Sequence, residues 1–310
     1  MLWINKMFQL GAGKPVNHLT TLKTFIVRPL ERNRLRYVAL TSGRNEEKYI
    51  ERTMKGVLSQ NPPPDAYVVV DDGSTDSTPR ILEDRHGVQV VRLENPRHPT
   101  RGVNLAWALN AGVKRATELV PDWQYLLKVD ADSVIHPGYF NQLLGKFREN
   151  PRLGVTSGTP QDEKVWRGRA SDGAKVYRRG CWDEIRHFVP CNAFDTVAML
   201  QAKRYGWVVE SFPKINYTQL RTWRRGNLRR WILSGRSRYY IGFPSWHTFL
   251  IAGVYSTHSP WVIGGLSMFM AHALTALGGL KKPFPQEFYE FVKKYAMWET
   301  LERYHERRLT

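Results

Sequence analysis

Two short apolar segments end in acidic residues, and this pattern limits the folds that the chain can adopt. The first segment is VVVDDGSTDST, residues 68–78, and the second is LLKVDADS, residues 126–133. Aspartate, glycine, serine and threonine are turn residues, so each segment is typical of a buried strand that opens into a polar loop. Carboxylates therefore stand at the ends of two predicted strands.

Strand and helix patterns alternate around these acids, as judged from the spacing of apolar residues. The predicted elements are a strand at 37–42, a helix at 45–60, strands at 66–70 and 88–93, a helix at 101–119 and a strand at 124–129. Asp76 or Ser77 can cap a short helix that carries Ile81 and Leu82. The alternation predicts an α/β fold with a mostly parallel sheet flanked by helices, in which ligands bind at the carboxyl ends of the strands.

Asp71 and Asp72 lie at such a carboxyl end. A carboxylate in this place can accept hydrogen bonds from a nucleobase NH group or from ribose hydroxyls. The same residues also fit an ordinary turn followed by a helix cap. Nucleotide binding and a purely structural turn are therefore both open for this pair.

Asp130 and Asp132 follow the strand at 124–129. Residues i and i+2 of an extended segment point to the same side, so both carboxylates can face one hard cation. A divalent ion with two protein carboxylates keeps coordination positions for substrate phosphates and neutralises charge on a diphosphate leaving group. Two acidic strand ends in an alternating pattern favour a nucleotide and metal site more strongly than either would alone.

Four segments carry a resemblance to a known family: TSGRNEEKYIERTMKGVLSQ, VVVDDGSTDST, TRGVNLAWALNAGVKRA and LLKVDADSVIHPGYF, in this order. Together they resemble the nucleotide-sugar half of the inverting family 2 glycosyltransferases, which have the Rossmann-like GT-A fold. The resemblance extends from residue 36 to about residue 210. It implies a nucleoside-diphosphate sugar as the donor and Mn²⁺ or Mg²⁺ as the cofactor, bound by Asp130 and Asp132.

The resemblance also implies which residues contact the donor. These nucleotide-sugar-binding residues are Thr41, Arg44, Glu46, Asp72, Arg101 and Asp130. Glu46 also suits the first turn of a helix, where the helix dipole favours acids. Arg101 opens the predicted helix at 101–119, and a helix N-terminus with a nearby arginine suits phosphate.

An inverting transfer needs a general base opposite the leaving diphosphate. In similar enzymes this base is an acid ahead of a helix, in an ED-like motif, and Asp195 fits that place here, although Phe194 replaces the first acid. Asp195 could instead serve as the N-cap of the helix, a role that would not exclude catalysis. Asp183 and Glu184 are the second choice for the base.

The segment GNLRRWILSGRSRYY, residues 226–240, resembles the QxxRW motif of processive polysaccharide synthases, with Asn227 in place of glutamine. Arg230 could bind a diphosphate bidentately, and the Trp231 indole offers a flat face for a sugar ring of the acceptor. An equally good interpretation is a basic amphipathic helix that lies on anionic lipid.

The charge of the chain is uneven. Its net charge is +18, and no Asp or Glu occurs between Glu210 and Glu287. The apolar stretch 260–280 is long enough for a membrane span, an interfacial helix or a buried helix. Lys281 and Lys282 after it favour the cytoplasmic face of a membrane. We therefore expect a cytoplasmic enzyme, peripheral or monotopic on an anionic membrane surface, with a lipid-linked or glycan acceptor.

Two other functions fit parts of the sequence. A nucleic-acid-binding protein would explain the positive charge but gives the acidic strand ends no role. A nucleotidyltransferase could use an alternating sheet and paired acids, but the glycine-rich phosphate loop expected after its first strand is missing. We therefore expect no nucleic-acid partner.

The predicted domain organisation has three parts: an N-terminal extension at 1–35, a GT-A catalytic domain at 36–212 and a helical, membrane-associated or acceptor-side region at 213–310. The last part contains the basic and apolar segments. Two cysteines, Cys181 and Cys191, are too few for a disulfide framework and indicate a reduced intracellular protein.

Overall fold

The computed structural model describes residues 35–94, 98–161, 166–221, 228–257, 260–279 and 282–309, with side chains up to residue 302. Arg36–Thr310 is one compact unit. Residues 1–34 of the predicted N-terminal extension lie outside the described residues, and so does Asn227.

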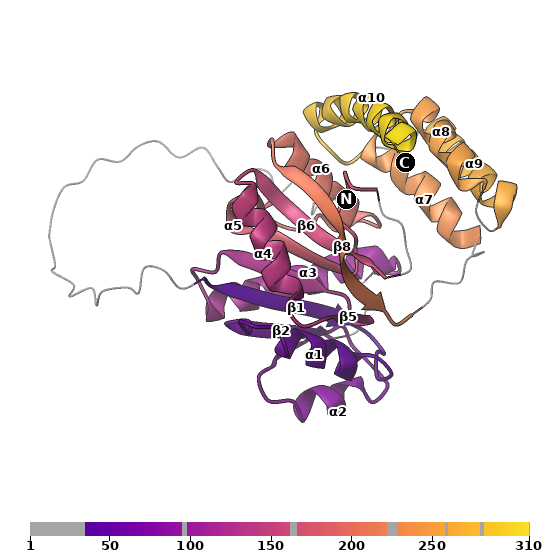
Figure 1. The fold of residues 1–310 in the computed structure, drawn as a ribbon. Coiled ribbons are helices and arrows are strands. Elements are labelled where there is room, and N and C mark those ends of the chain that lie inside the picture. The colour runs from indigo at the N-terminus through magenta and orange to yellow at the C-terminus, as the bar shows by residue number, and fades with distance from the viewer. Residues whose placement is uncertain are drawn as a thin grey trace, which may run out of the picture. The chain divides into compact units, whose positions relative to one another are not determined.

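A single sheet forms the centre of this unit (Figure 1). Its strands are β1 (Tyr37–Gly43), β2 (Ala66–Asp71), β3 (Gln89–Arg92), β4 (Tyr125–Val129), β5 (Ser133–Ile135), β6 (Leu153–Pro160), β7 (Ala174–Arg178) and β8 (Val208–Gln219). They are ordered β3-β2-β1-β4-β7-β6-β8-β5. The pairs among β3, β2, β1 and β4 are parallel, so the carboxyl ends of β1, β2 and β4 share one edge.

The second half of the sheet is mixed. β7 runs antiparallel to both β4 and β6, β6 pairs in parallel with β8, and β5 runs antiparallel to β8. The α/β class with flanking helices is confirmed, although the described sheet is mixed rather than mostly parallel in this half. The strand β7 brings its residues beside the carboxyl end of β4, where the acids of the second motif lie.

Helices cover both faces of the sheet. They are α1 (Ile50–Leu58), α2 (Thr78–Glu83), α3 (Arg101–Leu119), α4 (Tyr139–Glu149), α5 (Arg179–Ile185) and α6 (Phe194–Arg204). Helices α3, α5 and α6 share one hydrophobic cluster with Val38 and Leu40 of β1. Tyr37, which points to the other face, stacks on Phe140 of α4 with ring centroids 3.7 Å apart.

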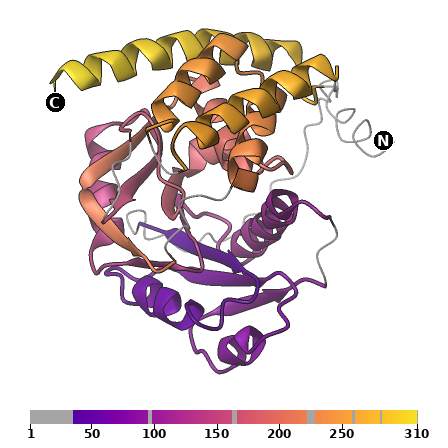
Figure 2. The same cartoon turned by 90° about the vertical axis from the view of Figure 1, so that its right-hand side faces the viewer.

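Four helices form the C-terminal part: α7 (Leu228–Ile241), α8 (Ser245–Tyr255), α9 (Trp261–Leu277) and α10 (Gln286–Leu309). Helix α10 packs on α6 through a cluster that includes Leu200, Phe288 and Val292. Helix α9 packs on both α7 and α8, as the two views show (Figures 1 and 2). No helix of the described part of the chain has the length and hydropathy required to cross a membrane.

The sequence patterns placed most elements well, with one clear difference at α1. The predicted helix at 45–60 begins only at Ile50, because Asn45 has a left-handed backbone with a φ of 58° and residues before Tyr49 form a turn. Ser77 is the N-cap residue of α2 without a side-chain cap, and Asp76 instead accepts from the backbone N–H groups of Glu47 and Thr78.

Candidate functional site

The two aspartates at the end of β2 have different surroundings. Asp71 is buried, and its Oδ1 accepts a hydrogen bond from the backbone N–H of Ser74 at 3.0 Å, which holds the turn. Asp72 is half-buried, and its backbone N–H donates to the Gly43 carbonyl at 3.0 Å. Asp71 therefore has the structural role of the pair, and Asp72 follows it into the loop at the shared edge of the sheet.

The end of β1 and the loop after it hold the other predicted nucleoside contacts. Thr41 is fully buried, and its hydroxyl lies 2.9 Å from the Tyr67 hydroxyl. Arg44 is exposed, whereas Glu46 is buried and forms an ion pair with Arg221. Burial raises the pKa of the Glu46 carboxyl, although the Arg221 guanidinium opposes this shift. The structure thus brings Glu46 together with a basic residue that is 175 positions away in the chain.

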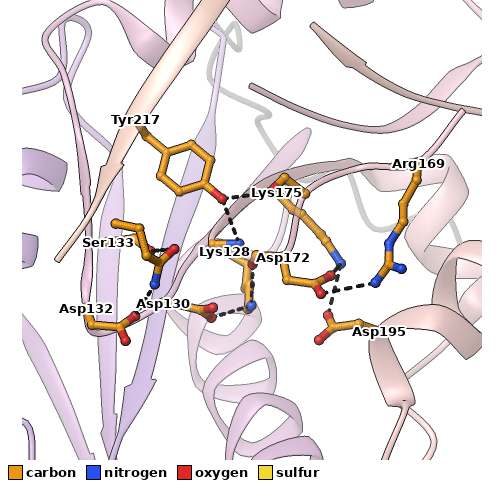
Figure 3. A network of polar contacts seen from close by, with 12 residues as sticks. Lys128, Asp130, Asp132, Ser133, Arg169, Asp172, Lys175, Asp195 and Tyr217 are labelled. Atoms are coloured by element: carbon orange, nitrogen blue, oxygen red, sulfur yellow. Dashed lines mark hydrogen bonds and ion pairs between the residues drawn. The ribbon is translucent and has the colours of Figure 1, made fainter. Parts of the chain in front are cut away.

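Asp130 and Asp132 lie side by side directly after β4 (Figure 3). Oδ1 of Asp130 accepts from the Lys128 ammonium group at 2.5 Å. Oδ1 of Asp132 accepts from the Gln219 amide at 2.8 Å, and its Oδ2 lies 3.5 Å from Nε of Arg221. Arg221 therefore bridges Asp132 and Glu46, which ties the acid after β4 to the loop after β1.

The donor atoms of this pair fit a hard divalent cation. Both side chains offer carboxylate oxygens, the ligands that Mg²⁺ and Mn²⁺ prefer. Among the described residues there is no group of three or more His, Cys, Asp or Glu side chains that could hold a metal. A divalent ion on these two carboxylates would need further ligands, such as water or phosphate oxygens.

Asp195 lies in the first turn of α6 and faces the sheet rather than the helix end. The N-cap of α6 is Ala193, so the alternative role of Asp195 as N-cap is wrong. Instead, Oδ1 of Asp195 accepts from the ammonium group of Lys175 at 3.1 Å, and its side chain is only 18% exposed. One oxygen of Asp195, Oδ1, is therefore held by the buried Lys175 ammonium group, while the carboxylate keeps some access to solvent.

Lys128 and Lys175 are the residues that connect these acids. They are direct cross-strand partners on β4 and β7, and both side chains are buried. Like charges in opposite positions of a sheet repel each other. Each ammonium group is therefore matched by acids: Lys128 pairs with Asp130, and Lys175 pairs with Asp172 at 2.7 Å as well as with Asp195.

The result is a row of alternating charges that runs from Asp130 to Asp195 (Figure 3). Burial raises the pKa of the Asp130 carboxyl to about 6, although the Lys128 ammonium opposes this shift. Burial opposes the charge of Lys175, but Asp172 and Asp195 outweigh it and raise the pKa of the ammonium group. Lys175 therefore remains a cation throughout the neutral range.

The sequence analysis did not find Lys128, Asp172 or Lys175. A signal was present, because each lysine interrupts an apolar strand, in LLKV and AKVY. A lysine in the interior of a strand pattern is a buried charge in need of a partner. Their pairing across β4 and β7 depends on an antiparallel neighbour that strand and helix alternation does not predict.

The remaining predicted residues lie around this row. Arg101 is exposed at the start of α3, where the adjacent Gly102 packs so closely on Asn192 that a Cβ would lie 2.7 Å from its Cα. This close approach brings the start of α3 beside the segment that leads into α6. The second-choice bases, Asp183 and Glu184, lie elsewhere, on the exposed side of α5. Asp183 pairs with Arg179, and Glu184 accepts a hydrogen bond from the Trp207 indole.

Arg230 and Trp231 lie on α7, in the C-terminal part of the structure. Arg230 is exposed. The Trp231 ring packs on Tyr255 of α8, with ring centroids 5.0 Å apart, and belongs to the cluster between α7, α8 and α9. The described structure thus gives Trp231 a packing role, and its predicted contact with the acceptor stays a prediction.

Residues 42–203, just over half of the chain, match the model of the protein family described as "Glycosyl transferase family 2". The chain belongs to glycosyl transferase family 2. The resemblance drawn from the four sequence segments is thereby confirmed. The matched range includes the row of charges from Asp130 to Asp195.

Individual relatives agree with this family. A poly-β-1,6-N-acetyl-D-glucosamine synthase of Staphylococcus epidermidis is 32% identical over 120 residues, which cover 38% of this chain and 26% of that protein. The matched segment thus spans about a quarter of that relative. A solved mannosyltransferase of Pyrobaculum calidifontis, in complex with GDP-Man and Mn²⁺, has a TM-score of 0.55 and 18% identity, and the match covers 91% of this chain and 88% of that one. The structural likeness supports the GT-A fold.

Proposed function

We propose that this glycosyltransferase moves a sugar from a nucleoside-diphosphate sugar to a lipid-linked or glycan acceptor, with inversion at the anomeric carbon. The observation that carries the proposal is the row of charges that joins Asp130 and the adjacent Asp132 to Asp195 through two buried lysines. This arrangement supports the proposal, because it brings together the carboxylates that would hold a metal and the carboxylate that would accept a proton. Nucleic acid has no part in this proposal.

The donor would bind across the carboxyl ends of β1, β2 and β4. Asp72 and Glu46 would accept hydrogen bonds from the nucleoside, Arg44 would line the same nucleoside pocket, and Arg101 would contact the phosphates. Thr41, which is fully buried, would lie beneath the floor of this nucleoside pocket. Asp130 and Asp132 would hold Mn²⁺ or Mg²⁺, and such an ion, when bound, neutralises the charge that develops on the leaving diphosphate. The mannosyltransferase complex with GDP-Man and Mn²⁺ is consistent with this cofactor.

Asp195 would act as the general base. Its Oδ1 is held by Lys175, so the side chain has a fixed orientation, and Oδ2 would accept the proton of the acceptor hydroxyl. The acceptor oxygen then forms a bond to the anomeric carbon as the bond from that carbon to the diphosphate breaks. The nucleoside diphosphate leaves with the electron pair, and Asp195 retains the proton until product release.

The acceptor would approach from the side of the C-terminal helices. Arg230 would contact the diphosphate or the acceptor, and Trp231 would offer its ring to a sugar, as in the motif that their segment resembles. The relative that makes poly-β-1,6-N-acetyl-D-glucosamine supports a glycan as acceptor. We place the enzyme at the cytoplasmic face of a membrane, as a peripheral or monotopic protein.

The donor site is tested by the melting temperature of the protein with UDP, GDP and their common sugars, with and without Mn²⁺. A ligand that binds only the native state stabilises it, by about 2.7 kcal/mol when its concentration is a hundred times Kd, and so raises the melting temperature. We expect a metal-dependent shift with one nucleotide in the wild type and a much smaller shift in Asp132→Asn. The base is tested in Asp195→Asn, which should keep the donor shift but lose transfer to an acceptor.

A different result would count against the proposal. Equal shifts with and without metal in the wild type and in Asp132→Asn would remove the metal from the donor site. A folded protein that binds none of the nucleotides, but binds DNA or RNA in a salt-sensitive and metal-independent way, would favour the nucleic-acid alternative. Release of pyrophosphate from a nucleoside triphosphate would identify a nucleotidyltransferase instead.

A further inference from the structure

Helices α8 and α9 expose an unusual number of large apolar side chains. Ten such residues on the two helices are at least 46% exposed, up to 68% for Trp261 and 85% for Leu277. We define them as the α8–α9 face, which consists of Trp246, Phe249, Leu250, Trp261, Val262, Ile263, Leu266, Met270, Leu274 and Leu277. The largest apolar patch on a typical monomer covers roughly 300–600 Å², and larger exposed patches mark interaction sites. Ten large exposed side chains on two neighbouring helices make this face a candidate for such a site.

The spacing of these residues shows that each helix exposes one side. The positions on α8 are separated by three and four residues, and six of the seven on α9, at 262, 263, 266, 270, 274 and 277, lie on one stripe of that helix, while Trp261 is its first residue. The rings of Phe249 on α8 and Phe269 on α9 touch, with centroids 5.4 Å apart. The two stripes are therefore continuous across the contact between the helices.

The opposite sides of α8 and α9 are already used for packing. A Cβ on Gly265 would lie 2.2 Å from the carbonyl oxygen of Ala252, and a Cβ on Gly235 of α7 would lie 2.0 Å from the carbonyl oxygen of Met268. Backbones approach this closely only where glycine removes the side chain. The α8–α9 face is thus the outer side of a tightly packed layer, and its exposure does not result from loose packing.

The segment that carries this face has charges of one sign, and the acid that approaches α8 from α10, Glu299, is buried 3.8 Å from His247. No Asp or Glu occurs between Glu210 and Glu287, and the exposed basic residues of the region include Arg229, Arg236 and Lys282. Basic residues beside an apolar stripe are attracted to anionic lipid, by about 1 kcal/mol for each Lys or Arg near the surface. A second copy of this chain would present the same positive charges and would be repelled.

We propose that the α8–α9 face inserts into the boundary between headgroups and acyl chains of an anionic bilayer, without crossing it. This inference deepens the proposed membrane location and rests on that part of the proposed function. An amphipathic helix in such a position buries its apolar side by about 5–10 Å. Trp246 and Trp261 suit this depth, because an indole has an apolar body and a polar N–H group. Seven of the ten residues lie on α9.

The proposal is tested by flotation of the full chain with phosphatidylcholine vesicles that contain or lack phosphatidylglycerol. The test variant carries Leu250→Gln, Leu266→Gln and Leu274→Gln, all on the α8–α9 face. A matched control carries Val90→Gln, Met297→Gln and Leu301→Gln, three exposed apolar residues in other places. We expect the wild type and the control to float with anionic vesicles, and the test variant to bind at least about tenfold more weakly.

Four results would overturn the proposal. They are a wild type that does not bind vesicles, a test variant that binds as well as the wild type, a control that loses binding to the same extent, and a lipid-free dimer that the test substitutions convert to a monomer. The nucleotide-induced melting shift, measured on the same samples, separates the two proposals. Loss of vesicle binding with an intact nucleotide shift affects only the membrane face, and the reverse result affects only the donor site.

Discussion

Replacement of Lys175 by methionine tests whether the row of charges depends on this ammonium group. Methionine keeps most of the apolar stem, so the substitution removes the charge while leaving little empty volume. The Lys175 side chain is fully buried, and it pairs with Asp195, which is 18% exposed, and with Asp172, which is 46% exposed. Asp195 would lose its cation and has little access to water, whereas Asp172 would keep its ion pair with Arg169 at 3.2 Å.

The magnitude follows from these exposures. Removing one partner of a buried ion pair costs about 3–5 kcal/mol, because the other charge remains buried and unpaired. Asp172 is half exposed and is screened by water, so its share is small. We therefore expect a loss of about 3 kcal/mol in the free energy of unfolding, which corresponds to a fall of roughly 6–12 °C in melting temperature.

Equilibrium unfolding in urea measures this loss. Lys55→Met is the matched control, because Lys55 is exposed on α1, and it should change the free energy of unfolding by less than about 0.5 kcal/mol. The double variant Lys175→Met with Asp195→Asn removes the unpaired carboxylate as well and should recover part of the stability. A loss below about 1 kcal/mol for Lys175→Met, or no recovery in the double variant, would refute the reasoning.

Two further predictions concern the C-terminal helices and a helix on the sheet. Burial and the nearby Arg238 lower the pKa of His272 to about 4, so the unfolded chain takes up a proton first and the free energy of unfolding should fall as the pH falls from 6.5 to 4. The variant His272→Gln should lose this pH dependence while exposed His86→Gln keeps it, and an unchanged slope in His272→Gln would contradict the prediction. Gly235→Ala should lower the free energy of unfolding by about 1–3 kcal/mol, because the new Cβ meets a carbonyl oxygen of α9, whereas Gly145→Ala meets nothing within 4 Å and should stabilise α4 by up to about 1 kcal/mol. Thermal unfolding of both variants measures these changes, and equal effects would show that α7 and α9 can separate freely.

The sequence predicted the parallel half of the sheet well, because local patterns determine it. The helix expected at 101–119 is found as Arg101–Leu119, and the strands before Asp72 and Asp130 end where the acids begin. These elements combine apolar periodicity with clear turn residues, so neighbouring residues suffice to place them. The positions of the acids after β2 and β4 were therefore within reach of pattern reasoning.

The contacts that organise the site were not predictable in this way. Lys128 and Lys175 meet because β7 runs antiparallel to β4, and Arg221 reaches Glu46 across most of the catalytic region. Both contacts depend on strand order, which apolar spacing does not encode. Likewise, the sequence pointed to the segment at 260–280 as a membrane candidate but not to α8, whose exposed stripe appears only when the two helices are packed together.

The bridge made by Arg221 has a practical consequence for work with the purified protein. Its guanidinium group pairs with both Glu46 and Asp132, so one positive charge already offsets part of the negative charge of these two acids without a divalent ion. Folding therefore does not depend on the proposed metal, and extraction with a chelator should yield a folded protein. Such a sample offers a stable starting point for a calorimetric titration with Mn²⁺, in which binding at the proposed site would have to displace this internal counter-ion.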